Sequence, residues 1–264
     1  MTAARKRVDL LLVERRLVAS REEAARFILA GKVRAGERRI DKPGTLLPQD
    51  TALEVAAPSH PYVSRGGVKL RHALEAFGVD PGGRVCLDVG ASTGGFTDCL
   101  LQAGARQVIA VDVGYGQLAP RLRADSRVHV LERTNIRALD VSRLPTRPNL
   151  ATIDVAFISL ALVLPVVVRC LDSPGEVVAL VKPQFEVGKG QVGKRGVVRD
   201  PALHRAVLER VAGFAGEQGF VVLGMTASPL LGPMGNREFL VHLATRGIGA
   251  DVAGLIAHAM APAA

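Results

Sequence analysis

The stretch that decides the fold is Val85-Cys-Leu-Asp-Val-Gly-Ala-Ser-Thr-Gly-Gly-Phe-Thr97. It begins as an apolar run typical of a buried strand, continues into a glycine-rich turn and ends at the start of a helical pattern. A strand followed by such a turn and a helix is how an α/β sheet forms a crevice for a nucleotide-sized ligand. Gly90, Gly94 and Gly95 let the backbone approach a ligand that side chains would block. The sequence therefore predicts a ligand-binding turn at the carboxyl end of a buried strand.

The glycine spacing separates this turn from two common phosphate-binding loops. It is Gly-x-x-x-Gly-Gly rather than the Gly-x-Gly-x-x-Gly of dinucleotide sites, and no Gly-Lys-Ser/Thr follows it. Acidic residues accompany it instead. Asp88 precedes the turn, and Asp112 ends the next expected strand, where a carboxylate can accept hydrogen bonds from ribose hydroxyls. A glycine-rich turn can also be a plain connection, but the two acids favour a binding site, and this layout resembles a site for S-adenosylmethionine.

The rest of the chain after residue 84 alternates between strand and helix patterns. Helices are expected at 95–103, 118–124, 160–171 and 201–218, and strands at 84–89, 107–113, 127–131, up to 154, 176–181, 220–226 and 237–243. Such alternation predicts an α/β fold with a doubly wound, mostly parallel sheet and helices on both faces.

The first sixty residues have a different order of helix and strand patterns. Val8, Leu11, Leu12 and Leu17 could line one face of a helix. The stretch Ser20-Arg-Glu-Glu23 is a capping box that opens a second helix. A hairpin at 33–40 and a strand at 51–55 follow, and a proline-containing linker comes before residue 61. These elements predict a small α+β domain.

Positive charge is concentrated in this first part of the chain. Residues 1–72 hold 15 Lys and Arg against 8 Asp and Glu, whereas residues 73–264 hold 19 against 17. A basic segment joined to a nearly neutral body suggests a module that binds a polyanion. A solvated surface that happens to be basic is the alternative.

The sequence gives little support for a membrane protein, a disulfide-bonded protein or a metal-binding protein. The apolar uncharged run 155–168 has 14 residues, and a bilayer span needs about 20. Cys86, Cys99 and Cys170 are widely spaced and odd in number, so neither a disulfide framework nor a metal knuckle is indicated. We expect no membrane association, no metal and a cytoplasmic location.

Several longer strings carry a resemblance to a known family. These are Asp88–Thr97, Val111–Leu118, Glu132–Asn135, Leu180–Gly190 and Gly232–Phe239. Together they resemble the TlyA family (haemolysin A-like proteins), which is similar to the FtsJ-like ribose 2′-O-methyltransferases. Ser20–Ala24 and Gly31–Gly36 resemble the small RNA-binding domain named after the fourth small-subunit ribosomal protein.

The resemblance implies a function and a domain organisation. The implied activity is S-adenosylmethionine-dependent 2′-O-methylation of cytidine ribose in ribosomal RNA, in the large subunit and in some members also in the small subunit. The cofactor would be S-adenosyl-L-methionine, and the partners would be ribosomal RNA and ribosomal subunits. The expected fold is a Rossmann-like methyltransferase domain at 84–246, preceded by an RNA-binding domain at 1–60 and a linker with a lead-in helix at 61–83. A C-terminal helix or tail would occupy 247–264.

The resemblance also implies a catalytic tetrad of Lys69, Asp154, Lys182 and Glu238. A ribose hydroxyl is a poor nucleophile, so it must be held in line with the methyl group and must lose its proton. Lys182 is the expected base or hydroxyl-orienting group. Lys69 would add a second cation, and the two carboxylates would orient the ammonium groups. Taken alone, the lysines could be solvated and Glu238 could be an ordinary strand residue.

Two further sets of residues are expected to bind ligands. The expected cofactor-binding residues are Asp88, Gly90, Ala91, Ser92, Thr93, Gly94, Gly95, Phe96, Asp112, Val113 and Asn135. The expected RNA-binding residues are Arg5, Arg7, Arg21, Lys32, Arg34, Arg38, Arg65, Lys189 and Lys194. If the target nucleotide is flipped out, Tyr62, Tyr115 or a phenylalanine would stack on its base.

Two other classes of function remain open from the sequence. One is a membrane-active cytolysin, as the older family label suggests, although it would need an amphipathic or spanning segment. The other is a non-catalytic RNA-binding factor in ribosome assembly. If the protein is a non-catalytic factor, Lys182→Ala should keep full activity in cells. If it is a methyltransferase, Lys182→Ala should lose methyl transfer and keep its affinity for RNA.

Overall fold

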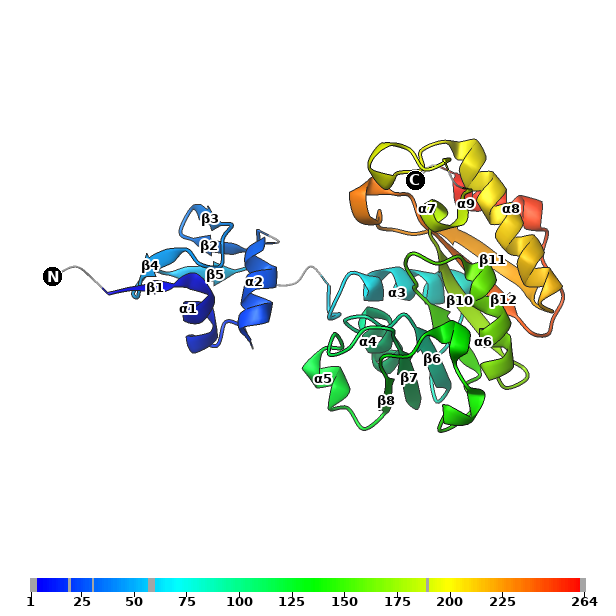
Figure 1. Ribbon diagram of the computed structural model, residues 1–264, viewed down its shortest axis with the longest axis horizontal. Helices are drawn as coiled ribbons and strands as arrows, with labels where there is room; N and C mark the ends of the chain where they lie inside the picture. Colours follow the sequence, from blue (N-terminus) through cyan, green and yellow to red (C-terminus); the bar gives the residue numbers. More distant parts are fainter. Residues whose placement is uncertain (1–3, 19, 30, 57–59, 189, 262–264) are drawn as a thin grey trace. The chain divides into compact units, whose positions relative to one another are not determined.

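The structure is a computed structural model that describes residues 4–18, 20–29, 31–56, 60–188 and 190–261. The chain divides into two units, Met1–Pro61 and Tyr62–Ala264, and each unit is described by itself (Figure 1).

The first unit is a small α+β fold. Its elements are β1 (Arg5–Arg7), α1 (Val8–Glu14), α2 (Arg21–Leu29), β2 (Val33–Ala35), β3 (Arg38–Ile40), β4 (Leu46–Pro48) and β5 (Leu53–Val55). Strand β1 pairs antiparallel with β4, and β2 lies between β3 and β5 in a three-stranded antiparallel sheet. The sequence patterns do not mark β1 or β4, which are only three residues long.

The two helices of this unit supply most of its core. Val8, Leu11 and Leu12 of α1 are buried as expected, but Leu17 is 40% exposed. The expectation for Leu17 is wrong because α1 ends at Glu14 and Arg16 has a φ of +58°, which turns the chain out of the helix. The Glu23 amide donates to Ser20 Oγ at 3.2 Å, which is one of the two hydrogen bonds of the predicted capping box.

The second unit is built around a seven-stranded sheet with the order β11-β12-β10-β9-β6-β7-β8. Its strands are β6 (Val85–Val89), β7 (Gln107–Val111), β8 (Val128–Leu131), β9 (Leu150–Ile153), β10 (Glu176–Val181), β11 (Val221–Ala227) and β12 (Phe239–Ala244). Only β12 runs antiparallel to its neighbours. The prediction of a doubly wound, mostly parallel sheet is therefore confirmed.

Helices cover both faces of this sheet. They are α3 (Gly66–Phe77), α4 (Gly95–Gln102), α5 (Pro120–Arg123), α6 (Leu164–Cys170), α7 (Pro183–Glu186), α8 (Pro201–Glu217) and α9 (Val252–Met260). One buried cluster joins the sheet to α6, α8 and α9. A second cluster joins it to α3, α4 and the chain around α5. The expected helix at 160–171 is split into a 3₁₀ turn at Leu160–Leu162 and α6, because Pro165, which has no N–H, lies in the first turn of α6.

The cysteines and the helices bear on the expected absence of disulfides and of membrane spans. Cys86, Cys99 and Cys170 are free and buried, and burial raises the pKa of each thiol. Among the residues that the structure describes, no helix is long and apolar enough to cross a membrane.

Candidate functional site

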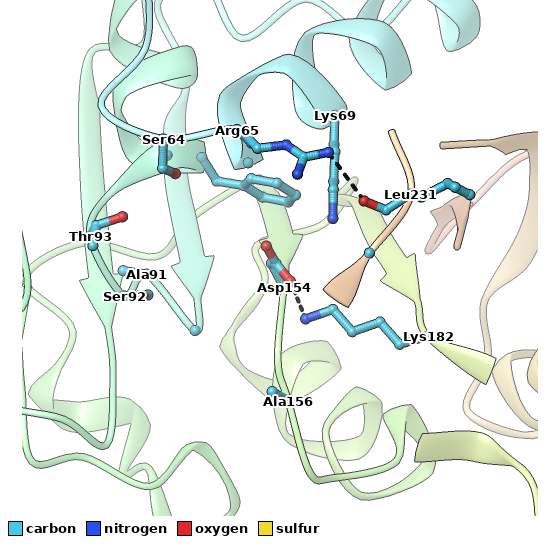
Figure 2. A pocket seen from close by; sticks show the side chains of 15 residues that line it. Ser64, Arg65, Lys69, Ala91, Ser92, Thr93, Asp154, Ala156, Lys182 and Leu231 are labelled. Carbon is cyan, nitrogen blue, oxygen red and sulfur yellow. Dashed lines mark hydrogen bonds and ion pairs between the residues drawn. The ribbon is translucent and has the colours of Figure 1, made fainter. Parts of the chain in front are cut away.

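A pocket of about 380 Å³ opens near the carboxyl ends of β6, β9 and β10 (Figure 2). Its wall is formed by the segment entering α3, by the glycine-rich turn after β6, and by residues that follow β9, β10 and β11. The strand order reverses here, since β7 lies on one side of β6 and β9 on the other. Ligands of open α/β sheets bind at such a switch point.

The glycine-rich turn lies directly against the end of β9. Gly90 has a φ of +84°, and a β-carbon at this position would lie 2.5 Å from the carbonyl oxygen of Asp154. A β-carbon on Gly95 would run into the hydroxyl of Ser64. The pocket is lined by six of the residues expected to bind the cofactor, namely Gly90, Ala91, Ser92, Thr93, Gly95 and Phe96.

Asp88, another expected cofactor residue, lies beneath this turn and does not line the pocket. It is completely buried, and its carboxylate accepts hydrogen bonds from Thr97 Oγ1 at 2.6 Å and Thr152 Oγ1 at 3.3 Å. Burial raises the pKa of Asp88 to about 7, with a smaller contribution from the charge of Asp154, while the hydrogen bonds from the threonines act in the opposite direction. Its contacts tie β6, β9 and α4 together below the turn.

The remaining expected cofactor residues lie outside the pocket wall. Asp112 Oδ2 accepts from the amide of Ser92 at 2.8 Å, and its Oδ1 accepts from the amide of Gly114 at 2.6 Å. Its carboxylate therefore fixes the glycine-rich turn to the loop after β7. Val113 is 68% exposed, and Asn135 Oδ1 accepts from the amide of Arg137 at 3.1 Å. The last of this group, Gly94, has a φ of +94° and caps α4.

Lys69 and Glu238 form a buried ion pair beside the pocket. Lys69 comes from α3 and is 8% exposed, and Glu238 precedes β12 and is 1% exposed. Lys69 Nζ donates to Glu238 Oε2. The other carboxylate oxygen, Oε1, has no hydrogen-bond partner among the described residues. A β-carbon on Gly232 would overlap this carboxylate, so glycine at that position leaves room for it.

Lys182 and Asp154 form a second ion pair, with Lys182 Nζ 2.6 Å from Asp154 Oδ1. Asp154 follows β9 and Lys182 follows β10, so two neighbouring strands deliver the two side chains. Both line the pocket, as does Lys69, and Figure 2 shows the two lysines approaching it from different elements. The structure thus brings all four residues of the expected tetrad to one place, with one carboxylate for each lysine.

An exposed aromatic side chain that the sequence does not single out lies near this site. Phe157 is 90% exposed and has a φ of +62°, an uncommon conformation for a bulky residue. Its ring centroid lies 5.0 Å from that of Phe185. Phe157 and Phe185 each come three residues after an acid or a lysine of the tetrad. That spacing is the signal in the sequence, but exposure and left-handed backbone cannot be read from it.

The loop that carries Phe157 is fixed to α7 by a glutamate. Glu186 accepts from Ser159 Oγ at 2.6 Å and from the Leu160 amide at 2.8 Å. Burial raises the pKa of Glu186, and these two hydrogen bonds act in the opposite direction. The segments after β9 and β10 are therefore joined behind the phenylalanine pair.

The two tyrosines have different environments. Tyr62 packs into the cluster around α3 and α4, and burial raises its pKa to about 12. A β-carbon on Gly67 would overlap its ring. Tyr115 is 68% exposed, and the Arg133 guanidinium lies 4.2 Å from its ring centroid. Of the aromatic candidates for stacking, Phe157 and Tyr115 are therefore the ones that are largely exposed.

The expected RNA-binding residues fall into separate groups. In the first unit, Arg7 and Arg21 both pair with Asp9, which is 3% exposed; the Arg7 guanidinium, more than Arg21, lowers the pKa of Asp9. Arg5, Lys32, Arg34 and Arg38 belong to the same unit.

The other cations belong to the second unit. Arg65 lines the pocket and donates to the Leu231 carbonyl at 3.2 Å. Lys189 lies outside the described residues, as does the side chain of Lys194. No group of three or more His, Cys, Asp or Glu side chains that could hold a metal ion occurs within the described residues.

Comparisons with known proteins agree with this arrangement. Residues 62–245 match the FtsJ-like methyltransferase family, and residues 6–51 match the S4 domain family. The 16S/23S rRNA (cytidine-2′-O)-methyltransferase TlyA of Mycobacterium tuberculosis is 53% identical over 92% of this chain and 91% of its own length.

Solved structures extend the comparison to the fold. A protein of Streptococcus thermophilus that carries the name hemolysin is 44% identical, with a TM-score of 0.75 and coverage of 96% of this chain and 94% of its own. An S-adenosylmethionine-dependent methyltransferase structure from Listeria monocytogenes shares the fold at 16% identity, with a TM-score of 0.52, over 69% of this chain and 99% of its own.

Proposed function

Since the chain belongs to the FtsJ-like methyltransferase family, we propose that it transfers a methyl group from S-adenosylmethionine to the 2′-hydroxyl of a cytidine in ribosomal RNA. The observation that carries the proposal is the pair of lysine–carboxylate contacts, Lys69–Glu238 and Lys182–Asp154, beside one pocket. The identity to a cytidine methyltransferase along most of the chain supports the choice of substrate. A ribosomal RNA substrate in turn favours a cytoplasmic location.

The pocket suits a nucleoside cofactor. Its volume of about 380 Å³ lies in the usual range for small-molecule sites, about 300–1,000 Å³. Gly90 and Gly95 add no side chain to the turn, and Asp154 lines the same pocket. When bound, S-adenosylmethionine would supply the electrophilic methyl group. The residues of the turn would hold it, and Asp112 would keep the turn in place through the Ser92 amide.

The two ion pairs give each lysine a defined task. Lys182 is half-buried, follows β10 and faces the pocket, so it is suited to hold the 2′-hydroxyl and either to accept its proton or to donate to its oxygen. Asp154 holds the Lys182 ammonium beside the pocket through their ion pair. Lys69, held by Glu238, adds positive charge that stabilises the alkoxide character of the reacting oxygen.

A target nucleotide that is flipped out of an RNA helix needs an aromatic surface on which its base can stack. Phe157 offers an exposed ring backed by Phe185, and Glu186 fixes the loop behind it. Stacking of a base on an aromatic ring contributes about 1–3 kcal/mol. We assign Phe157 to this role, with the ribose placed toward Lys182.

The S4-like unit would dock the enzyme on structured RNA. Arg34 and Arg38 lie on adjacent strands of its three-stranded sheet, and its excess of cations suits contacts with phosphates. Binding through phosphates is dependent on salt and independent of sequence. The choice of nucleotide would then depend on the methyltransferase unit.

The test is transfer of labelled methyl from S-adenosylmethionine to purified ribosomal subunits, followed by mapping of the modified nucleotide. We expect one or a few cytidines to carry the label as 2′-O-methylcytidine. Lys182→Ala should lower the rate by about 10²–10⁴-fold, the usual contribution of general acid–base catalysis, and should keep the affinity for RNA. Absence of transfer to either subunit and to naked ribosomal RNA would refute the proposal.

A further inference from the structure

Two irregular segments meet beside the catalytic pairs through one asparagine. Asn236 lies two residues before Glu238 and is 3% exposed. Its Nδ2 donates to the Gly196 carbonyl at 2.9 Å, and its Oδ1 accepts from the Val198 amide at 3.1 Å. The side chain therefore holds the backbone of segment 190–198 from the segment that leads into β12.

Val198 is held from its other side by a histidine of α8. His204 is 4% exposed, and its Nε2 lies 2.9 Å from the Val198 carbonyl oxygen, so this nitrogen is the donor. The His204 ring meets the Phe239 ring edge-on, with centroids 5.5 Å apart. Phe239 is the first residue of β12 and directly follows Glu238. Both polar backbone groups of Val198 are thus fixed, the N–H by Asn236 and the carbonyl by His204, whose ring contacts the residue after Glu238.

The same asparagine reaches the Lys69–Glu238 pair through its backbone. The Asn236 carbonyl accepts from the Gly232 amide at 2.8 Å, and Gly232 packs on the Glu238 carboxylate so closely that no β-carbon would fit. Continuous contacts therefore run from segment 190–198 through Asn236 and Gly232 to Glu238. These contacts give a route by which a shift of the segment would reach the Glu238 carboxylate, which has little free space.

Segment 190–198 has the features of a surface that meets RNA phosphates. It contains Lys194 and Arg195 between three glycines, Gly190, Gly193 and Gly196. Arg195 is exposed and has a φ of +62°, and Gly196 has a φ of +75°. The backbone is thus held in an uncommon conformation at two exposed residues, Arg195 and Gly196, while Asn236 anchors the end of the segment.

We propose that Asn236 is a positioning residue that couples segment 190–198 to Glu238, so that binding of RNA phosphates by the segment sets the position of the Lys69–Glu238 pair. The inference rests on the proposed methyl transfer to RNA and adds a way in which substrate binding is sensed. In this scheme RNA that fails to engage the segment is bound by the rest of the enzyme but is methylated slowly.

The kinetic test compares Asn236→Ala with the wild-type enzyme on the ribosomal subunit that the wild type methylates. We expect kcat to fall by about 10-fold or more, because small displacements of reacting groups are costly. The KM for RNA and the Kd for S-adenosylmethionine should change by less than about 3-fold, which is the split expected for positioning. The control is Asn149→Ala, which removes a partly buried asparagine just before the amino end of β9, at the edge of the sheet away from the pocket, and which should keep kcat.

A double-mutant cycle tests the coupling itself. Arg195→Ala should lower kcat in the wild-type background and should have little further effect in the Asn236→Ala background. His204→Gln, which can keep a donor for the Val198 carbonyl, should retain more activity than His204→Ala. Effects of Arg195→Ala and Asn236→Ala that simply multiply would overturn the proposal, as would a loss of RNA affinity as the sole defect of Asn236→Ala.

A hydrogen-exchange measurement separates this proposal from the proposed function. Binding of ribosomal RNA to the full chain should slow amide exchange in 190–198 and also in 236–240, without any methyl transfer being required. In Asn236→Ala, RNA should protect 190–198 alone. Protection of 236–240 that is the same in both proteins contradicts the coupling, even if methyl transfer is observed. Coupled protection in a protein that transfers no methyl group would instead leave the coupling standing and refute the function.

Discussion

The backbone of Gly90 lies so close to Asp154 that a β-carbon at position 90 would come within 2.5 Å of the Asp154 carbonyl oxygen. This contact joins the turn expected to hold the cofactor to the residue expected to orient Lys182. In the proposed reaction, the position of the methyl donor relative to Lys182, which would hold the hydroxyl acceptor, therefore depends on this backbone contact.

Gly90→Ala should weaken both the fold and cofactor binding. Alanine would need the left-handed conformation at φ +84° and would push against backbone rather than a flexible side chain, at a cost of about 1–3 kcal/mol. We expect the Kd for S-adenosylmethionine, measured by calorimetry, to rise at least 10-fold. Gly78→Ala is the matched control, since Gly78 has a φ of +66° but open space around it. It should lose stability and keep cofactor affinity; equal Kd values for the two variants would contradict this account.

Gly232→Ala should reduce activity and also stability. The new β-carbon would displace the end of the Glu238 side chain and weaken its buried contact with Lys69. We expect kcat to fall by about 10-fold or more and the free energy of unfolding to fall by up to about 3–5 kcal/mol, the cost of breaking a buried ion pair. Gly213→Ala, in α8 with nothing near its β-carbon, should keep kcat. An unchanged kcat for Gly232→Ala would show that the position of Glu238 does not matter for transfer.

Asp88 should make the protein less stable as the pH rises from about 4 to about 7. Burial raises its pKa from 3.8 to about 7, so between these values the folded protein keeps a proton that the unfolded chain has released. Raising the pH then favours the unfolded chain, by at most about 1.4 kcal/mol for each pH unit. Asp88→Asn has no such proton, so its melting temperature should vary less over this range. Asp50→Asn, at an exposed position, should follow the wild-type curve, and a wild-type slope in Asp88→Asn would contradict the assignment.

Phe157→Ala should impair use of RNA without affecting the cofactor. The ring is 90% exposed, so its removal should leave the melting temperature unchanged. Loss of one base–aromatic stack corresponds to about 1–3 kcal/mol, and we expect kcat/KM for ribosomal RNA to fall by about 5- to 150-fold. Phe157→Trp should restore most of it, because it keeps a flat aromatic face. Ile248→Ala, at another exposed apolar residue, serves as the control; equal activity of Phe157→Ala and this control would remove Phe157 from the site.

The sequence predicts the sheet well because its evidence is local. The buried strands at Val85–Val89 and Glu176–Val181 are apolar runs between clear turn signals, and the pattern around each is enough to place it. The short strands β1 and β4 cannot be predicted from the sequence, because three residues are too few to show a periodic pattern. They form by pairing with each other.

The site is predicted less completely, since much of it depends on contacts between distant segments. The four residues of the tetrad come from four segments, and a family resemblance is what connects them in the sequence. Asp88 illustrates the opposite problem. Its position suggests a ligand contact, but the hydroxyls of Thr97 and Thr152 take its carboxylate instead. Whether an acid at a strand end faces the ligand or the interior is decided by neighbours that the local pattern does not contain.

The position of β12 in the sheet has a consequence for the newly made chain. This strand is the last of the seven to be synthesised, yet it inserts between β10 and β11 rather than adding to an edge. Glu238 enters the site with it, so Lys69 has no carboxylate partner until the strand is in place. Assembly of the four-residue site therefore waits until the chain has been made as far as β12, and a chain that stops before Glu238 carries the cofactor turn with an incomplete tetrad.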